Sequence, residues 1–248
     1  MKIYCRTSKL ANLDAREQFR MVTEAIEFYE ELFGTPFPYA KYDQIYVPEF
    51  RIRGMENVGM ITLTDRCLVD AASVTEDSLL LHRRVTVHEL AHMWFGDLVT
   101  MQWWNDLWLK ESFADFCASK CLEEHPAIAN NNPSDGVHVP LMFTERALDA
   151  DTKPTTHPIQ VPIRHTGDGE NAFDMISYAK GACWIKVMDN FVGRPVVKLG
   201  MQKYFQRFSE GNTVLTDLVG CMNEAMSEIH GENQSVDLIQ WTDSWLKK

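Results

Sequence analysis

The sequence predicts an α+β fold in which a small strand-containing lobe precedes a mostly helical lobe. Two observations support this prediction: apolar runs typical of strands occur only before residue 73, and helical spacing of apolar residues dominates from Val74 onward. With 248 residues, 45% of them hydrophobic, the chain can bury one large core. We therefore predict a single domain, with a mixed strand and helix lobe over 1–73 and a mainly helical lobe over 74–248.

The first lobe is expected to begin with a helix. Apolar residues recur at helical spacing from Asp14 to Phe33, Asp14 and Glu17 have the spacing of a capping box, and Gly34 is a typical helix stop. Two strands and an intervening edge segment are then expected at Tyr42–Val47, Val58–Leu63 and Arg51–Asn57.

The second lobe shows helical patterns almost throughout, and no further strand is expected in it. The interval from Ala150 to Glu170 contains several prolines and Gly167-Asp168-Gly169, which indicate a surface or cleft-lining loop. The helices are expected at Thr75–Leu98, Leu107–Glu124, Val139–Leu148, Phe173–Phe191, Pro195–Phe208, Leu215–Ile229 and Val236–Leu246.

Charge and cysteine content narrow the function classes. The 35 acidic and 24 basic residues give a net charge of -11, which disfavours nucleic acid as a partner. Neither a membrane segment nor a secretory signal is recognisable, so we expect a cytoplasmic protein. The six cysteines are expected to be reduced thiols. Cys117 and Cys121, one helical turn apart, are interpreted as small buried side chains rather than as a metal or redox pair.

A metal-binding pattern occurs within the first helix of the second lobe. His88 and His92 flank Glu89 at helical spacing, so both imidazoles lie on one helix face and can share a zinc ion. A catalytic zinc needs a third protein ligand, which Glu111 on the next helix would supply. Glu89 would then serve as general base toward a zinc-activated water. Asp115, one turn after Glu111, is a candidate to orient a zinc-bound histidine.

The sequence around these residues resembles that of the gluzincin zinc aminopeptidases, the family of aminopeptidase N and puromycin-sensitive aminopeptidase. The segment His88-Glu-Leu-Ala-His-Met-Trp-Phe-Gly-Asp is followed by Trp103-Trp-Asn-Asp-Leu-Trp-Leu-Lys-Glu111. Eighteen residues separate His92 from Glu111, as in that family. The resemblance implies a thermolysin-like zincin catalytic domain, one zinc ion per chain held by His88, His92 and Glu111, and removal of N-terminal residues from peptides.

A second family signature, usually Gly-Ala-Met-Glu-Asn, corresponds here to Arg53-Gly54-Met55-Glu56-Asn57. The resemblance assigns this segment to substrate binding and implies that Glu56 binds the free α-amine of a peptide. A carboxylate that holds a protonated N-terminus would place the first peptide bond at the metal. The segment is also a candidate edge strand for pairing with the substrate backbone.

A third segment, from Phe173 to Ala182, is similar to the family segment whose tyrosine stabilises the transition state, which gives Tyr178 that role. His157 also lies in a family-like segment, and we interpret it as structural.

Several departures from the family pattern are present: Arg53 and Gly54 stand where glycine and alanine are usual. Likewise, Lys110 and Ser112 replace the more frequent asparagine and glycine.

Family members usually carry an N-terminal β-rich domain and a C-terminal helical domain, and neither is recognised in this sequence. Two alternatives to an aminopeptidase therefore stay open. One is a zinc endopeptidase, and the other is a truncated, catalytically impaired zinc-binding fragment that acts through partner contacts.

Overall fold

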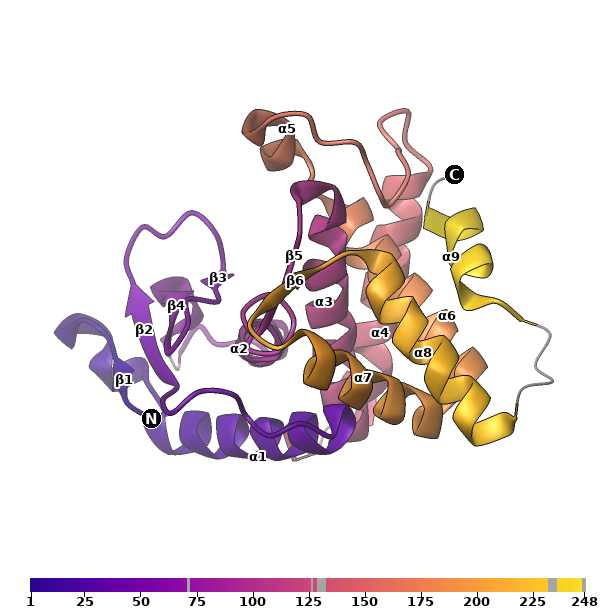
Figure 1. Ribbon diagram of the computed structural model, residues 1–248. Helices are drawn as coiled ribbons and strands as arrows, with labels where there is room; N and C mark the ends of the chain where they lie inside the picture. The colour runs from indigo at the N-terminus through magenta and orange to yellow at the C-terminus, as the bar shows by residue number, and fades with distance from the viewer. Residues whose placement is uncertain (71, 126, 129–132, 232–235, 247–248) are drawn as a thin grey trace.

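The computed structural model describes residues 1–70, 72–125, 127–128, 133–231 and 236–246. It is mixed, with strands concentrated in the first part of the chain and helices in the rest, which confirms the α+β class. In Figure 1 the first sheet lies on one side of α2, and α6, α8 and α9 lie on the other. Within the described residues, no helix is both long enough and apolar enough to cross a lipid bilayer.

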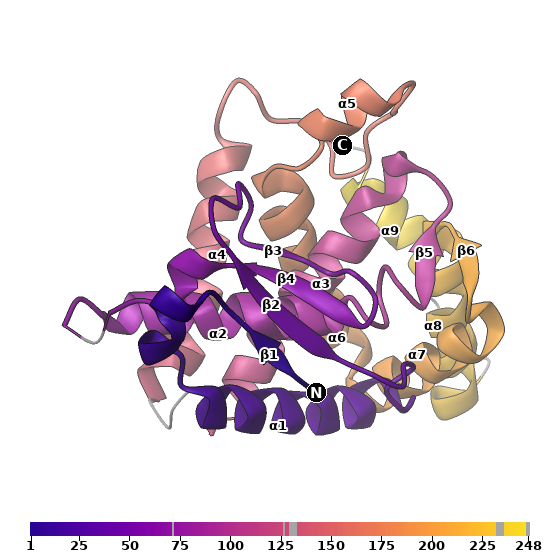
Figure 2. The same cartoon turned by 90° about the vertical axis from the view of Figure 1, so that its left-hand side faces the viewer.

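The first sheet has the strand order β1-β2-β4-β3. Its strands are β1 (Ile3–Tyr4), β2 (Asp43–Val47), β3 (Gly54–Met55) and β4 (Met60–Thr64). β2 pairs in parallel with β1 and β4, whereas β3 pairs antiparallel with β4 and forms an edge of the sheet (Figure 2). The strand expected at Val58–Leu63 begins later, at Met60, because Gly59 has φ +75° and the amide of Met60 bonds to Asn57 in a turn.

Helix α1 (Ala15–Phe33) begins and ends where the sequence indicates. The carboxylate of Asp14 accepts a hydrogen bond from the amide of Glu17, and Gly34 ends the helix in the left-handed conformation. The phenol of Tyr29 donates to the carbonyl of Val87 at 2.9 Å. α1 is thereby fixed to the turn of α2 that immediately precedes His88.

Helix α2 (Glu76–Ala91) starts at a capping box formed by Thr75 and Ser78. The expected extension to Leu98 is wrong, because the chain turns after His92 and Gly96 adopts φ +127°. β5 (Val99–Met101) follows and pairs in parallel with β6 (Gly211–Thr213). The expectation that strands are absent after Val74 is therefore also wrong; segments this short carry no readable alternation in the sequence.

Among the remaining elements, η3, η4, α4 and α6 pack against α3, and α9 packs against α8. The segment Phe173–Phe191, expected as one helix, is instead a π-helical turn followed by α6, and the loop expected up to Glu170 contains the short helix α5. The elements are η1 (Thr7–Asn12), η2 (Asp65–Cys67), η3 (Trp104–Asp106), α3 (Leu107–Glu124), α4 (Pro133–Asp151), α5 (Thr166–Asn171), η4 (Ile176–Lys180), α6 (Gly181–Val192), α7 (Arg194–Phe208), α8 (Leu215–His230) and α9 (Leu238–Leu246).

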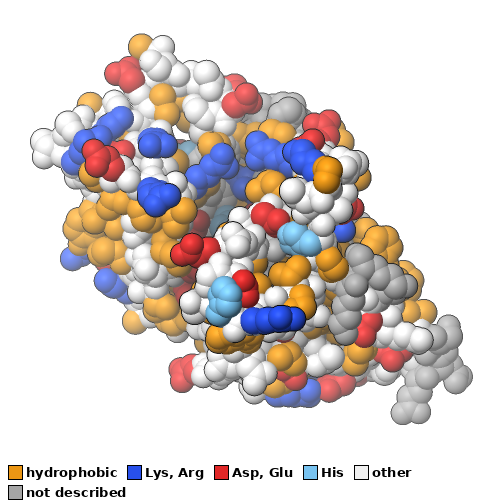
Figure 3. All heavy atoms as spheres, turned by 90° about the horizontal axis from the view of Figure 1, so that it is seen from above, with side chains coloured by type: hydrophobic (Ala, Val, Ile, Leu, Met, Phe, Trp, Pro, Cys, Tyr) orange, Lys and Arg blue, Asp and Glu red, His pale blue; other side chains and the backbone are white. Residues whose placement is uncertain are grey.

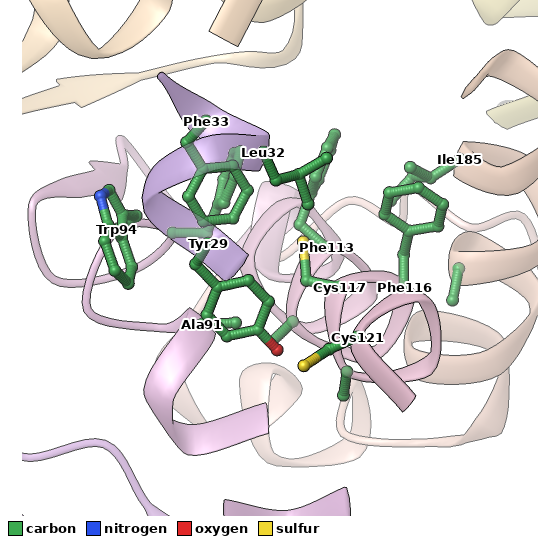
Figure 4. Close-up of a cluster of buried hydrophobic side chains, with 14 of the residues drawn as sticks. Tyr29, Leu32, Phe33, Ala91, Trp94, Phe113, Phe116, Cys117, Cys121 and Ile185 are labelled. Carbon is green, nitrogen blue, oxygen red and sulfur yellow. The ribbon is translucent and has the colours of Figure 1, made fainter. Parts of the chain in front are cut away.

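A continuous apolar core lies between α1, α2, α3 and α6. Figure 4 shows Tyr29 and Phe33 of α1 beside Trp94, with Phe113 and Cys117 of α3 next to them. The ring of Phe113 stacks on Phe95 with centroids 4.5 Å apart. Because Phe113 is two residues from Glu111, this packing fixes the position of the helix that carries the third candidate ligand.

We predict that Phe113→Ala lowers the free energy of unfolding by about 3–5 kcal/mol, because its fully buried ring would leave a cavity. Phe19→Ala on α1 is the matched control: that ring is 39% exposed, and its loss should cost less than about 1 kcal/mol. Urea denaturation of both variants measures the difference. Equal losses for the two would contradict the assignment of Phe113 to the core.

Candidate metal centre and active site

Three side chains from two helices converge on one point. His88 lies in the last turn of α2, His92 caps that helix, and Glu111 lies in the first turns of α3. The Nε2 atoms of His88 and His92 are 3.1 Å apart, and Oε2 of Glu111 lies 3.6 Å and 3.4 Å from them. Ligands of a tetrahedral zinc ion at its usual bond lengths lie about 3.3 Å apart. The residues present therefore fit a zinc ion, and all three are buried.

The other nitrogen of each imidazole is held by a group outside this triangle. Nδ1 of His92 donates to the carbonyl of Phe95 at 2.8 Å, and Nδ1 of His88 lies 2.7 Å from a carboxylate oxygen of Asp115. The same oxygen of Asp115 lies 2.7 Å from the guanidinium of Arg84. These contacts direct both Nε2 atoms toward Glu111, which is the arrangement that metal-binding histidines require.

Burial and neighbouring charges shift the ionisation of this group strongly. Burial alone would lower the pKa of His88, but Asp115 and Glu111 outweigh it and raise that pKa to about 10. Burial also opposes ionisation of Glu111, yet His92 and His88 bring its pKa well below the ordinary value. Zinc would therefore compete with a proton on His88, so zinc affinity should fall as the solution becomes more acidic.

Glu89 lies beside the candidate ligands and against the edge strand. One carboxylate oxygen of Glu89 lies within 4.8 Å of a ring nitrogen of His92 and of a carboxylate oxygen of Glu56. Burial raises the pKa of Glu89 to about 7. A methyl group at Gly54 would come within 2.0 Å of the Glu89 carboxylate, so the glycine leaves room for the position that Glu89 occupies.

Tyr178 reaches the same site from the π-helical turn η4 (Ile176–Lys180). Its ring lies nearly parallel to that of His88, with centroids 6.2 Å apart. Burial and the adjacent Glu111 carboxylate raise its pKa well above the ordinary value, so the phenol stays protonated. π-Helical turns are uncommon and occur frequently at functional sites.

Two side chains fix this turn in place. The hydroxyl of Ser112 donates to the carbonyl of Ser177 at 2.5 Å, and a carboxylate oxygen of Asp174 accepts from the amides of Ile176 and Ser177. Asp174 in turn contacts Nε2 of His157 at 2.7 Å. This contact gives His157 a structural role, consistent with the interpretation from sequence.

The segment Arg53–Asn57 brings only part of its side chains into the site. Glu56 is buried there, and Gly54 contacts Glu89, whereas Arg53 is exposed and the amide of Asn57 donates to Thr62 at 2.9 Å. Met55 is half-buried on β3 and pairs with Thr62 of β4. Of the expected substrate-binding residues, Glu56 and Gly54 are therefore the ones in contact with the buried carboxylate and imidazole groups.

Lys110 points inward, which the sequence alone left open. Its ammonium lies 2.5 Å from a carboxylate oxygen of Glu56 and 2.9 Å from Oε1 of Glu111. Glu56, Glu89 and His92 form a second possible metal-binding group in the described residues. Lys110 contacts one carboxylate of each group, so it does not separate them. Because two histidines with one carboxylate suit zinc better than one histidine with two carboxylates, the group of His88, His92 and Glu111 is the stronger candidate.

Sequence reasoning missed Arg84, although a signal was available. Arg84 lies one helical turn before His88 on α2, and Asp115 lies one turn after Glu111 on α3. Each pair shares a helix face, so the two faces can bring these four side chains together.

Cys117 and Cys121 are buried, free thiols, as interpreted from their spacing. In the view from above, Lys and Arg side chains gather along the border of a hollow in the surface (Figure 3).

We predict that Asp115→Asn weakens zinc binding about 10- to 100-fold, because the amide no longer holds the His88 ring with a charged acceptor. Asp189→Asn is the control: Asp189 is a buried carboxylate that pairs with Lys120 of α3 at 2.8 Å, away from the candidate ligands. Competition with a fluorescent chelator measures both affinities. A wild-type zinc affinity for Asp115→Asn would remove Asp115 from the metal centre.

Comparison of the sequence with known proteins identifies the family of this chain. The family model described as "Peptidase family M1 domain" matches residues 17–245. Aminopeptidase N of Streptomyces lividans is 39% identical over 245 residues, which are 99% of this chain and 27% of that protein. Leucyl aminopeptidase of Saccharolobus solfataricus is 37% identical over 230 residues, covering 91% of this chain and 28% of its own. Tricorn protease-interacting factor F2 of Thermoplasma volcanium is 37% identical over 217 residues, which are 85% of this chain and 26% of that protein. The chain thus spans about a quarter of the length of the curated relatives it matches. A family match over most of the chain, with relatives of more than one-third identity, shows that the chain belongs to peptidase family M1.

Proposed function

We propose that this chain is the catalytic domain of a zinc-dependent aminopeptidase that hydrolyses the N-terminal peptide bond of peptides. The observation that carries the proposal is the spacing of His88, His92 and Glu111, which suits one tetrahedral zinc ion, with Glu89 and Tyr178 beside it. The relatives named aminopeptidases support the reaction class. We infer a thermolysin-like domain, with its first lobe over 1–73 and its second over 74–248.

Zinc held by His88, His92 and Glu111 would polarise the scissile carbonyl and lower the pKa of a water molecule. In this proposal Glu89 accepts a proton from the attacking water and passes it to the departing amine. Burial raises the pKa of Glu89 to about 7. A group whose pKa lies near the working pH can both accept and release a proton, so this pKa suits both steps near neutral pH.

Tyr178 supplies a hydrogen-bond donor for the negative charge that develops on the carbonyl oxygen. Since burial keeps the phenol protonated, it can donate throughout the neutral pH range. Ser112 and Asp174 restrain the backbone of its turn, so the donor is positioned before substrate arrives.

Glu56 is proposed to bind the α-ammonium of the substrate. It lies within 4.8 Å of Glu89 and His92, and a buried carboxylate forms strong hydrogen bonds with an ammonium group. β3 forms the edge of its sheet next to this carboxylate, so a peptide could add its backbone along that strand. The partners we propose are therefore peptides with a free N-terminus, together with the additional domains that the family usually carries.

We predict that Glu89→Gln retains zinc but loses turnover about 10²- to 10⁴-fold, because glutamine has the same shape and accepts no proton. Metal analysis and steady-state kinetics on the same preparation measure both quantities. If the variant turns over substrate at the wild-type rate, Glu89 is not the base.

We predict that Tyr178→Phe lowers kcat about 10²- to 10³-fold with little change in zinc content, because only the oxyanion donor is removed. Phe173→Leu is the control, since that exposed ring lies near Tyr178 but carries no donor. Full activity of Tyr178→Phe would exclude the phenol from the mechanism.

The decisive experiment for the function is hydrolysis of aminoacyl-aminocoumarin substrates and of matched N-acetylated ones, before and after chelation and zinc readdition. Chelator-sensitive release from free-amine substrates alone supports the aminopeptidase. Cleavage of internal bonds in blocked peptides would favour an endopeptidase. Zinc binding without any turnover would favour a fragment that is impaired without further domains.

A further inference from the structure

Lys110 occupies an unusual position for a lysine. Its aliphatic stem lies over Gly96, where an added methyl group would meet the stem at 3.3 Å, so the glycine leaves room for the lysine. The side chain is only 13% exposed, and the carboxylate-bearing side chains of Glu56 and Glu111 are 10% and 4% exposed. The ammonium is therefore shielded from water and held between two buried carboxylates.

Each contact of this ammonium has a distinct consequence. On Glu111, Lys110 contacts Oε1, while Oε2 faces the two imidazoles, so the lysine fixes which oxygen is directed at the metal centre. On Glu56, Lys110 contacts Oε1 at 2.5 Å. That contact joins a primary ammonium to a carboxylate, which is the same chemical pairing that a peptide N-terminus would make there.

We propose that Lys110 is a specificity-determining residue: its ammonium caps Glu56 and competes with the α-ammonium of the substrate for that carboxylate. The inference rests on the proposed function of Glu56 as the amine anchor. Two ammonium groups at one buried carboxylate repel each other with little screening by solvent. The lysine therefore lowers affinity for free N-termini and leaves affinity for blocked peptides unchanged.

The test compares binding of leucinamide and N-acetyl-leucinamide to the 248-residue chain by calorimetry, with and without zinc. Lys110→Met removes the charge and keeps the stem, and Lys110→Asn is a second uncharged variant should the first fail to fold. Lys110→Arg retains the charge. Lys120→Met is the matched control, because Lys120 also forms ion pairs on α3, about 15 Å along the helix.

We expect both uncharged variants to bind leucinamide about tenfold more tightly than the wild type, with N-acetyl-leucinamide unaffected. Lys110→Arg and Lys120→Met should bind both ligands as the wild type does. A purely structural loss would weaken both ligands together, so the ratio of the two affinities isolates the competition.

Unchanged or weaker leucinamide binding by Lys110→Met and Lys110→Asn would overturn the proposal. Glu56→Gln separates this failure from failure of the proposed function. If Glu56→Gln abolishes the preference for the free amine while the Lys110 variants behave as the wild type, the amine anchor stands and the competition does not. If neither the wild type nor any variant prefers the free amine, both are overturned.

Discussion

The architecture of this site depends on compensating buried charge between α2 and α3. Glu56, Glu89, Glu111 and Asp115 are all buried, and an unpaired buried carboxylate is strongly unfavourable. Arg84 neutralises Asp115 on one side, Lys110 contacts Glu56 and Glu111 on the other, and the two histidines lie between them. The removal of one member leaves its partner uncompensated, so these groups act as a unit rather than as separate pairs.

The apolar core provides the rigidity that this charged group requires. Tyr29 connects α1 to α2 through the carbonyl of Val87, and Phe113 anchors α3 two residues after Glu111. The π-helical turn is joined to α3 by Ser112, the residue directly after Glu111. Glu111, the turn that carries Tyr178 and the apolar core are thus fixed by neighbouring positions of one helix, which limits how far they can move relative to one another.

Much of this could be predicted from sequence where it depends on short spacing along a helix. His88, His92 and Asp115 fall into this class, and so do the bounds of α1, because capping and helical periodicity are local. The inward direction of Lys110 and the bond from Ser112 to Ser177 could not be predicted, since both depend on residues distant in sequence. The early end of α2 was not predicted because the apolar residues Met93, Trp94 and Phe95 continue the helical spacing, whereas the chain turns at Gly96, whose amide donates to the carbonyl of Val99 and whose carbonyl accepts from the hydroxyl of Thr100. The catalytic roles assigned to these residues remain predictions.

We propose that the compensated group between α2 and α3 holds one zinc ion at His88, His92 and Glu111. Anomalous diffraction at the zinc absorption edge, from crystals grown with zinc, locates the ion. We expect one strong peak at about 2.0–2.2 Å from Nε2 of both histidines and from Oε2 of Glu111. A peak centred instead on Glu56, Glu89 and His92, or no peak near these residues, would contradict it.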